Sequence, residues 1–280
     1  PCSQPVAMSC RPSPFRSAQR TPSAPFELAS IVCRCQGTAA APPRPIASAH
    51  AAMSLHPWII LFDIDGTLLT VDRTFNRPLL RSIIDELHID YPDMEKDPFS
   101  GRTDFDIISS FLVHHDNQDE LYQEFKALYL ERLSEEIQEH HVLRHDYVDE
   151  ALEYFSGPTF IRGLLTGNYP DAAVTKLRAA NIHQEFSFGA FGEFHSDRNM
   201  LPQLALEHIQ DSLAVTPDPH RFLIIGDTPR DVICAKSARM KCVAVTTGKF
   251  SREELAEYEP DLIIDSLAHP ADWILKFIIV

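Results

Sequence analysis

Apolar runs of strand length alternate with segments of helical periodicity from residue 58 onward. The runs at 58–64, 160–166, 186–194, 221–226, 242–246 and 262–265 predict six strands. Helical spacing between them predicts helices at about 170–180, 200–213, 229–238 and 251–258. This alternation is typical of an α/β fold in which helices cover both faces of a parallel sheet. We therefore expect a three-layer, Rossmann-like core.

One interval is too long to be a simple crossover between parallel strands. Residues 71–157 lack a strong strand signal, whereas 79–87, 105–112 and 121–137 place apolar residues at helical spacing. The pattern predicts a helical subdomain inserted after the first strand, with the core formed by residues 54–70 and 158–280. Ligands of open parallel sheets bind at the carboxyl ends of the strands, so this insertion is expected to cover the site.

Residues 1–53 differ in composition from the remainder of the chain. They contain nine of the 21 Pro, five Arg and one acidic residue, without an apolar period. Such a segment buries too little apolar surface to offset the entropy of ordering, so we expect disorder. Its composition is typical of a transit peptide for a plastid or mitochondrion. The alternative is upstream sequence with Met53 as the start, and a cytoplasmic protein.

Charge and cysteine content restrict the possible partners and compartments. The formal net charge is −15, which argues against nucleic acid because non-specific binding to it depends on Lys and Arg. No apolar run approaches the length of about 18 residues that spans a bilayer, so we expect no membrane partner. Four of the six Cys precede Met53, leaving Cys234 and Cys242, which indicates a reducing compartment without a disulfide framework.

The first predicted strand ends in two carboxylates, Asp63 and Asp65, followed by Gly66. Two like charges at the mouth of an apolar strand are unfavourable unless a cation or a proton compensates them. Mg²⁺, which prefers oxygen ligands, meets that requirement. The alternative is that Asp and Gly only serve the geometry of a turn.

Two further predicted strands end in polar residues. Thr166, Gly167 and Asn168 follow the second strand, and a helix start there offers backbone N–H groups to an anion. Asp227 and Asp231 follow the fourth strand. Asn168 could instead cap a helix, and Asp231 could complement a helix dipole. Three strand ends with such groups indicate one shared site.

These motifs resemble a known family. DIDGTL from Asp63, LLTGN at 164–168 and GDTPRD at 226–231 are similar, in order and spacing, to motifs one, two and four of the haloacid dehalogenase superfamily. The resemblance covers about residues 58–268. The helical insertion resembles the C1 cap class, and FSGRTD at 99–104 resembles the substrate-facing cap loop of phosphoglycolate phosphatase relatives.

The resemblance implies a catalytic role for each acidic residue. Asp63 would attack phosphorus and become an aspartyl phosphate, while Asp65 would protonate the leaving oxygen and then deprotonate the hydrolytic water. Mg²⁺ would be held by Asp63, the Asp65 main-chain carbonyl and Asp227, with Asp231 in or near the second coordination shell.

The resemblance also implies phosphate-binding residues, with one departure from the family pattern. Thr166 and the amides of Gly167 and Asn168 would hold the phosphoryl oxygens. The third motif is usually a Lys, but no Lys lies between 176 and 236, so we assign that role by position to Arg198. Arg is always charged and binds phosphate through two donors. The alternative is that Arg198 is an exposed loop residue.

Arg102 is the candidate for substrate selection by the cap. A cation there would suit a small substrate that carries a carboxylate besides its phosphate. An alternative of equal weight is a helix-entry turn with Thr103 or Asp104 as the cap.

The sequence thus predicts a Mg²⁺-dependent phosphatase that acts on a small phosphorylated metabolite through an aspartyl phosphate, with phosphoglycolate or a sugar phosphate suggested by the cap class. A phosphomutase would keep both acids and differ in its cap, whereas dehalogenases lack the second acid. A catalytically idle binding protein would be favoured by loss of Asp63, Asp65 or Asp227, and all three are present. Whether the protein is a monomer or a homodimer is left open.

Overall fold

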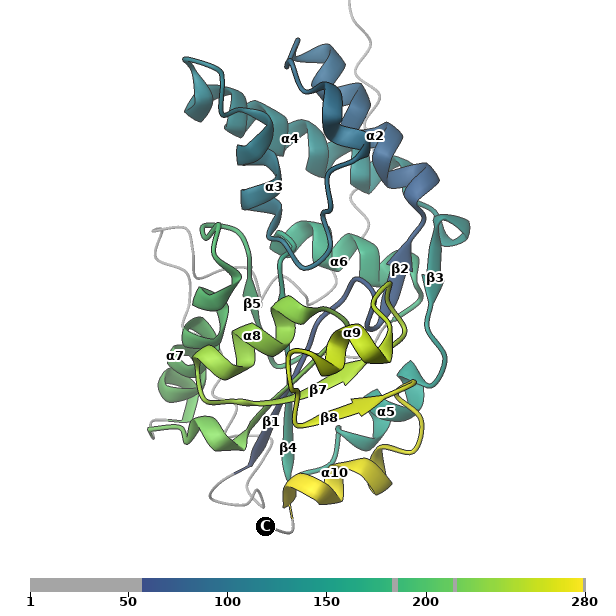
Figure 1. Cartoon of the computed structure of the whole chain (residues 1–280), viewed down its shortest axis with the longest axis vertical. Coiled ribbons are helices and arrows are strands. Elements are labelled where there is room, and N and C mark those ends of the chain that lie inside the picture. The colour runs from purple at the N-terminus through teal and green to yellow at the C-terminus, as the bar shows by residue number, and fades with distance from the viewer. Residues whose placement is uncertain (1–56, 183–185, 214–215, 279–280) are drawn as a thin grey trace, which may run out of the picture.

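The computed structural model describes residues 57–182, 186–213 and 216–278 (Figure 1). The predicted disordered segment 1–53 lies outside these residues. The core is a six-stranded parallel sheet with strand order β5-β4-β1-β6-β7-β8 (Figure 1). Its strands are β1 (Trp58–Phe62), β4 (Phe160–Thr166), β5 (Phe188–Phe191), β6 (Phe222–Gly226), β7 (Lys241–Val245) and β8 (Leu262–Ile264). This confirms the predicted α/β class and the approximate position of each strand.

Helices cover both faces of this sheet and form the insertion after β1. The core helices are α5 (Val148–Tyr154), α6 (Pro170–Ala179), α7 (Leu201–Leu213), α8 (Pro229–Ser237), α9 (Arg252–Ala256) and α10 (Pro270–Ile278). The inserted helices are α2 (Arg73–Glu86), α3 (Asp104–Phe111) and α4 (Gln118–Glu136), and we call these three the cap. Among the described residues, no helix has the length and apolar content needed to cross a bilayer.

Alternation along the strands explains the three layers. Ile60 and Phe62 of β1 pack into the cluster that includes residues of α5, α6 and α10. Ile59 and Leu61 pack into the cluster that includes residues of α7, α8 and α9. Because successive side chains of a strand point to opposite faces, an all-apolar strand is buried on both sides.

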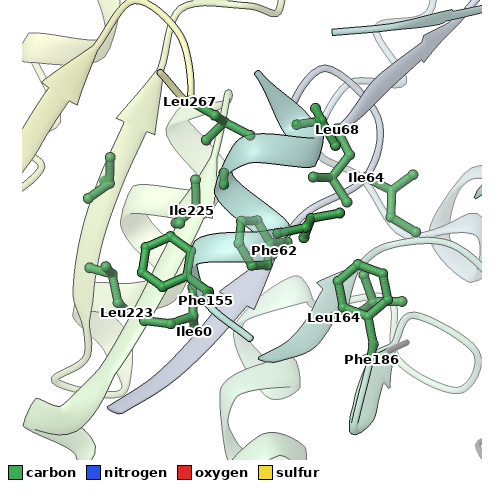
Figure 2. Close-up of a cluster of buried hydrophobic side chains, with 14 of the residues drawn as sticks. Ile60, Phe62, Ile64, Leu68, Phe155, Leu164, Phe186, Leu223, Ile225 and Leu267 are labelled. Atoms are coloured by element: carbon green, nitrogen blue, oxygen red, sulfur yellow. The ribbon is translucent and has the colours of Figure 1, made fainter. Parts of the chain in front are cut away.

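Figure 2 shows the first of these clusters around Phe62, with Phe155 and Phe186 beside it. The ring centroid of Phe62 lies 6.0 Å from that of Phe155 and 6.3 Å from that of Phe186, both in edge-on geometry. This packing fixes the carboxyl end of β1, which leads directly into the loop that carries Asp63 and Asp65.

The cap has a hydrophobic core of its own, built from residues of α2, α3 and α4 such as Leu80, Phe111 and Phe125. Tyr169 and Ala172 of the core domain complete that cluster, so the cap rests on the start of α6. In Figure 1 the cap lies beyond the carboxyl ends of the strands, as predicted. The chain passes between the two parts through an antiparallel ribbon of β2 (Leu69–Val71) and β3 (Val142–Arg144), which the sequence patterns did not predict.

The boundary of the insertion differs from the predicted range 71–157. Helix α5 belongs to the core, because Val148, Ala151 and Leu152 are buried in the same cluster as Phe62. The ring centroid of Phe155, directly after α5, lies 5.5 Å from the ring centroid of Trp273 in α10. The amphipathic pattern of a short helix does not specify which hydrophobic cluster receives its apolar face, and here burial on the sheet decides it.

Candidate active site

Three strand ends meet at one edge of the sheet. In the register of the ladders, Phe62 pairs with Leu164 of β4 and with Ile225 of β6. The residues that follow therefore emerge side by side, and Asp63 N–H donates to Ile225 O at 2.9 Å. The motifs read along the sequence are brought together in space, as predicted.

Asp63, Asp227 and Asp231 form a buried acidic group. One carboxylate oxygen from each lies within 4.8 Å of the others, a spacing that can hold a metal ion. Burial raises the pKa of Asp63 to about 6, against an opposing effect of Arg198. Burial also raises the pKa of Asp227 well above its ordinary value, assisted by Asp231 and Asp63. Three carboxylates so disposed are stabilised by a cation.

Asp227 shows most clearly that the site fits a cation. Its Oδ1 is buried without a hydrogen-bond partner. Glycine backbone packs against the other oxygen: a Cβ at Gly248 would lie 1.7 Å from Asp227 Oδ2, and one at Gly66, which has φ +87°, would lie 2.3 Å from it. A buried, unpaired carboxylate oxygen in a close-packed cradle fits a hard divalent cation with oxygen ligands.

Asp231 is engaged on both oxygens. Oδ2 accepts from the N–H of Thr228 at 3.0 Å and from its hydroxyl at 2.7 Å, which caps α8. Oδ1 accepts from Arg198 Nη2 at 2.6 Å. With its hydrogen bonds already made, Asp231 fits the predicted supporting position better than direct coordination.

Arg198 lies at the site rather than in an exposed loop. It begins the 3₁₀ helix η4 (Arg198–Met200), is 4 % exposed, and places Nη2 3.1 Å from Asp63 Oδ2. Its Nε is buried without a partner. The guanidinium therefore bridges Asp63 and Asp231 and has a donor to spare at the position predicted from motif order.

Asp65 is held by two residues of the β4–α6 region. Asn168 Nδ2 donates to Asp65 Oδ2 at 2.7 Å and to Thr166 Oγ1 at 2.8 Å. Lys176 Nζ lies 3.0 Å from Asp65 Oδ1 and 2.8 Å from Oδ2. Thr166 and Asn168 therefore lie beside Asp65 at the site, as the motif at 164–168 predicted.

Sequence reasoning missed Lys176 as a site residue. One signal was available: Lys176 stands three and four residues after Ala173 and Ala172, on the buried face of α6. A lysine at a core-facing helical position needs a buried partner. The pattern alone does not identify that partner.

Gly167, in the loop between β4 and α6, forms the contact of that loop with the inserted segment. Its carbonyl accepts from Asp104 N–H at 2.7 Å, and a Cβ at Gly167 would lie 2.2 Å from Arg102 O. Only glycine permits the cap loop to approach so closely.

The charged Arg102 guanidinium is already paired with carboxylates of the inserted segment. Its guanidinium donates to both Asp97 oxygens at 3.0 Å and to Asp106 Oδ2 at 2.6 Å, all within the inserted segment. Thr103 caps α3 by accepting from Asp106 N–H. The geometry matches the helix-entry alternative and lends no support to substrate selection by Arg102, because two carboxylates already balance its charge.

Comparison with known proteins places these motifs in a family. The family model described as haloacid dehalogenase-like hydrolase matches residues 60–245. Among curated proteins, the pyrophosphatase PpaX of Bacillus cereus (strain ATCC 10987 / NRS 248) is 24 % identical over 222 residues, which are 75 % of this chain and 92 % of PpaX.

Solved structures share the fold. A predicted phosphoglycolate phosphatase from Haemophilus somnus matches with TM-score 0.57 and 21 % identity, over 79 % of this chain and 99 % of its own. The β-phosphoglucomutase of Clostridium difficile matches with TM-score 0.59 and 18 % identity, over 79 % and 96 %. At such identities the matches speak for the architecture alone.

Proposed function

The chain belongs to the haloacid dehalogenase-like hydrolase family, and from this premise we propose that it is a magnesium-dependent phosphatase of small phosphomonoesters. One observation carries the proposal: the buried triad of Asp63, Asp227 and Asp231 meets the Arg198 guanidinium at the carboxyl edge of the sheet. A nucleophile, a cation site and a phosphate-binding cation are thereby gathered within one set of contacts.

In the proposed reaction Asp63 attacks phosphorus and the bond to the leaving oxygen breaks. Asp65 donates its proton to that oxygen, then accepts a proton from the water that attacks the aspartyl phosphate. Dividing the hydrolysis in this way replaces one difficult displacement by two easier ones. Arg198 and the Thr166 hydroxyl would hold the phosphoryl oxygens, whose charge in the transition state needs fixed donors.

The donor set supports a divalent cation. Asp63, Asp227 and the Asp65 main-chain carbonyl would hold Mg²⁺, with Asp231 supporting from behind through its bonds to Thr228 and Arg198. Bound Mg²⁺ offsets the repulsion between a carboxylate nucleophile and a phosphate dianion.

The substrate class follows from the cap and stays broad. The cap lies over the strand ends (Figure 1), which favours small metabolites over phosphoproteins. Phosphoglycolate and sugar phosphates are the first candidates. The neutralised Arg102 gives no separate reason to prefer a carboxylate-bearing ester, and the name of PpaX adds pyrophosphate to the candidates to be tested.

The decisive experiment measures phosphate release from an aryl phosphate and from a panel of small esters, with Mg²⁺ and with EDTA. Asp63→Asn is expected to reduce kcat by about 1,000-fold or more, because the nucleophile is lost. Glu124→Gln, an exposed acid of α4, serves as the control and should retain wild-type activity.

Two other outcomes have clear meanings. Conversion of a sugar phosphate into its isomer without net phosphate release would identify a phosphomutase on the same core. Magnesium binding without turnover of any ester or isomer would identify a binding protein and contradict the proposal.

A further inference from the structure

Lys176 is a buried cation at the site to which neither the motif pattern nor the proposed mechanism assigns a task. It lies on α6, between the core sheet and the cap, and is 4 % exposed. Its neighbours on the buried face of α6 are apolar, among them Ala172, Ala173 and Leu177. A charge in such a place is maintained only by specific partners.

All three Nζ contacts go to groups of the site. Nζ lies 3.0 Å and 2.8 Å from the two oxygens of Asp65 and 2.5 Å from Asn168 Oδ1. Asn168 Nδ2 in turn donates to Asp65 Oδ2 at 2.7 Å. Lys176, Asn168 and Asp65 therefore form a closed triangle of hydrogen bonds.

This triangle determines where the Asp65 carboxylate points. The Asp65 side chain is 41 % exposed, in contrast to the buried Asp63. Left alone on a loop, such a side chain would sample several rotamers. An acid–base group is effective only when it is held within hydrogen-bond reach of the atom it serves.

We propose that Lys176 is a positioning residue, which holds the Asp65 carboxyl in the orientation from which it transfers a proton to the leaving oxygen. The inference rests on the proposed phosphatase function. Lys176 acts through Asp65, and its partner Asn168 also orients the Thr166 hydroxyl at 2.8 Å.

The proton balance leaves Lys176 unchanged. In the first step the Asp65 carboxyl loses its proton to the leaving oxygen as Asp63 bonds to phosphorus. In the second step the Asp65 carboxylate takes a proton from the attacking water, while the bond between phosphorus and the Asp63 oxygen breaks. The Lys176 ammonium donates hydrogen bonds to Asp65 and Asn168 and transfers no proton in either step.

Two of the groups facing Lys176 come from the cap. Asp104 of α3 and Tyr129 of α4 both act on its charge. Asp104 also accepts from Tyr169 N–H at 2.8 Å, directly before α6. The cation that orients Asp65 is thus packed against the inserted helices, and its surroundings are complete only with the cap in place.

The test compares two leaving groups in Lys176→Met, a variant that keeps the length of the side chain and removes its charge. A nitrophenolate departs without help, whereas an alkoxide needs a proton from a well-placed acid. Loss of general-acid catalysis typically slows a reaction by about 100-fold or more. We expect kcat for glycerol 2-phosphate to fall by about 100-fold and kcat for 4-nitrophenyl phosphate by less than about 10-fold.

Four further variants separate positioning from folding. Lys176→Arg keeps the charge and should show a smaller change in the alkyl-to-aryl ratio, whether or not the Met variant folds. Asp65→Asn should lower the same ratio, and adding Lys176→Met to it should lower the ratio no further, because both changes remove one function. Lys236→Met, which removes an exposed lysine of α8, is the matched control and should leave both rates unchanged. Thermal unfolding of each variant measures its fold.

The outcomes distinguish this inference from its premise. If the wild-type protein hydrolyses neither ester nor any other phosphate ester of the panel, the proposed function fails and the inference fails with it. If the wild-type protein hydrolyses both esters, and folded Lys176 variants slow both by the same factor or by none, the inference alone is overturned. A selective loss on the alkyl ester in folded variants supports it.

Discussion

The Arg198 guanidinium lies 3.1 Å from the Asp63 carboxylate, and both side chains are buried. The nitrogen that makes this contact, Nη2, also lies 2.6 Å from Asp231 Oδ1. One cation therefore compensates two acids that would otherwise repel each other in a site shielded from water. The arrangement of these acids therefore depends on Arg198, independently of any bound metal.

Replacing Arg198 by Met should therefore destabilise the protein as well as impair catalysis. Removing one partner of a buried ion pair leaves uncompensated charge and typically costs about 3–5 kcal/mol. We expect a loss of that order in the free energy of unfolding, measured by urea denaturation without added metal. Arg252→Met is the matched control, because it breaks an exposed pair with Asp265, which is screened by water, and should cost much less stability. Equal losses in the two variants would contradict the assignment.

Asp227→Asn should remove most of the stabilisation that Mg²⁺ gives to the folded protein. A ligand that binds only the folded state stabilises it by about 2.7 kcal/mol at 100 times its Kd. We expect Mg²⁺ to raise the Tm of the wild-type protein and of Glu124→Gln, but to have little effect on Asp227→Asn. EDTA should reverse the shift. An undiminished Mg²⁺ shift in the variant would place the cation elsewhere.

Gly167→Ala should weaken the seating of the cap on the core. The new Cβ would lie 2.2 Å from the backbone oxygen of Arg102, so relief requires movement of the whole cap loop. We expect faster hydrogen exchange in residues 99–104 and a lower kcat/KM, with the core sheet unchanged. Gly157→Ala is the control, since its Cβ would meet no atom closer than 3.5 Å. Unchanged exchange in Gly167→Ala would show that the contact does not hold the cap.

The buried Asp104 should make stability depend on pH. Burial raises its pKa from 3.8 to about 6, against the opposing effects of Lys176 and the Tyr169 N–H. The folded protein therefore binds this proton more tightly than the unfolded chain does. Stability from this group is greatest below pH 3.8 and falls as the pH rises through 6, since the unfolded chain then bears fewer protons.

Asp104→Asn removes this dependence while keeping an acceptor for the Tyr169 N–H. A rise in pKa from 3.8 to about 6 corresponds to about 3 kcal/mol. The difference in the free energy of unfolding, variant minus wild type, should therefore increase by about 1 to 3 kcal/mol between pH 4 and pH 7. Urea titrations at several pH values provide the measurement. The exposed Asp171→Asn is the control, and the same pH trend in it would contradict the assignment to Asp104.

Local sequence patterns determined the core strands and the groups at their ends. The all-apolar run Trp58–Phe62, buried at every position, and the similar runs after it predict six strands in chain order, because an all-apolar run of strand length has few alternatives to a doubly covered sheet. Carboxylates immediately after such runs, as at Asp63 and Asp227, then lie at one edge by the geometry of a parallel sheet.

Tertiary structure decided which charges neutralise which. Lys176 lies 111 positions from Asp65 in sequence, and Arg102 meets Asp97 and Asp106 instead of a substrate. Likewise α5 packs on the sheet, although it lies within the predicted insertion. Strand and helix periods arise from neighbouring residues and are readable along the chain. The partner of a buried charge or an apolar helix face depends on long-range packing, which local periodicity does not encode.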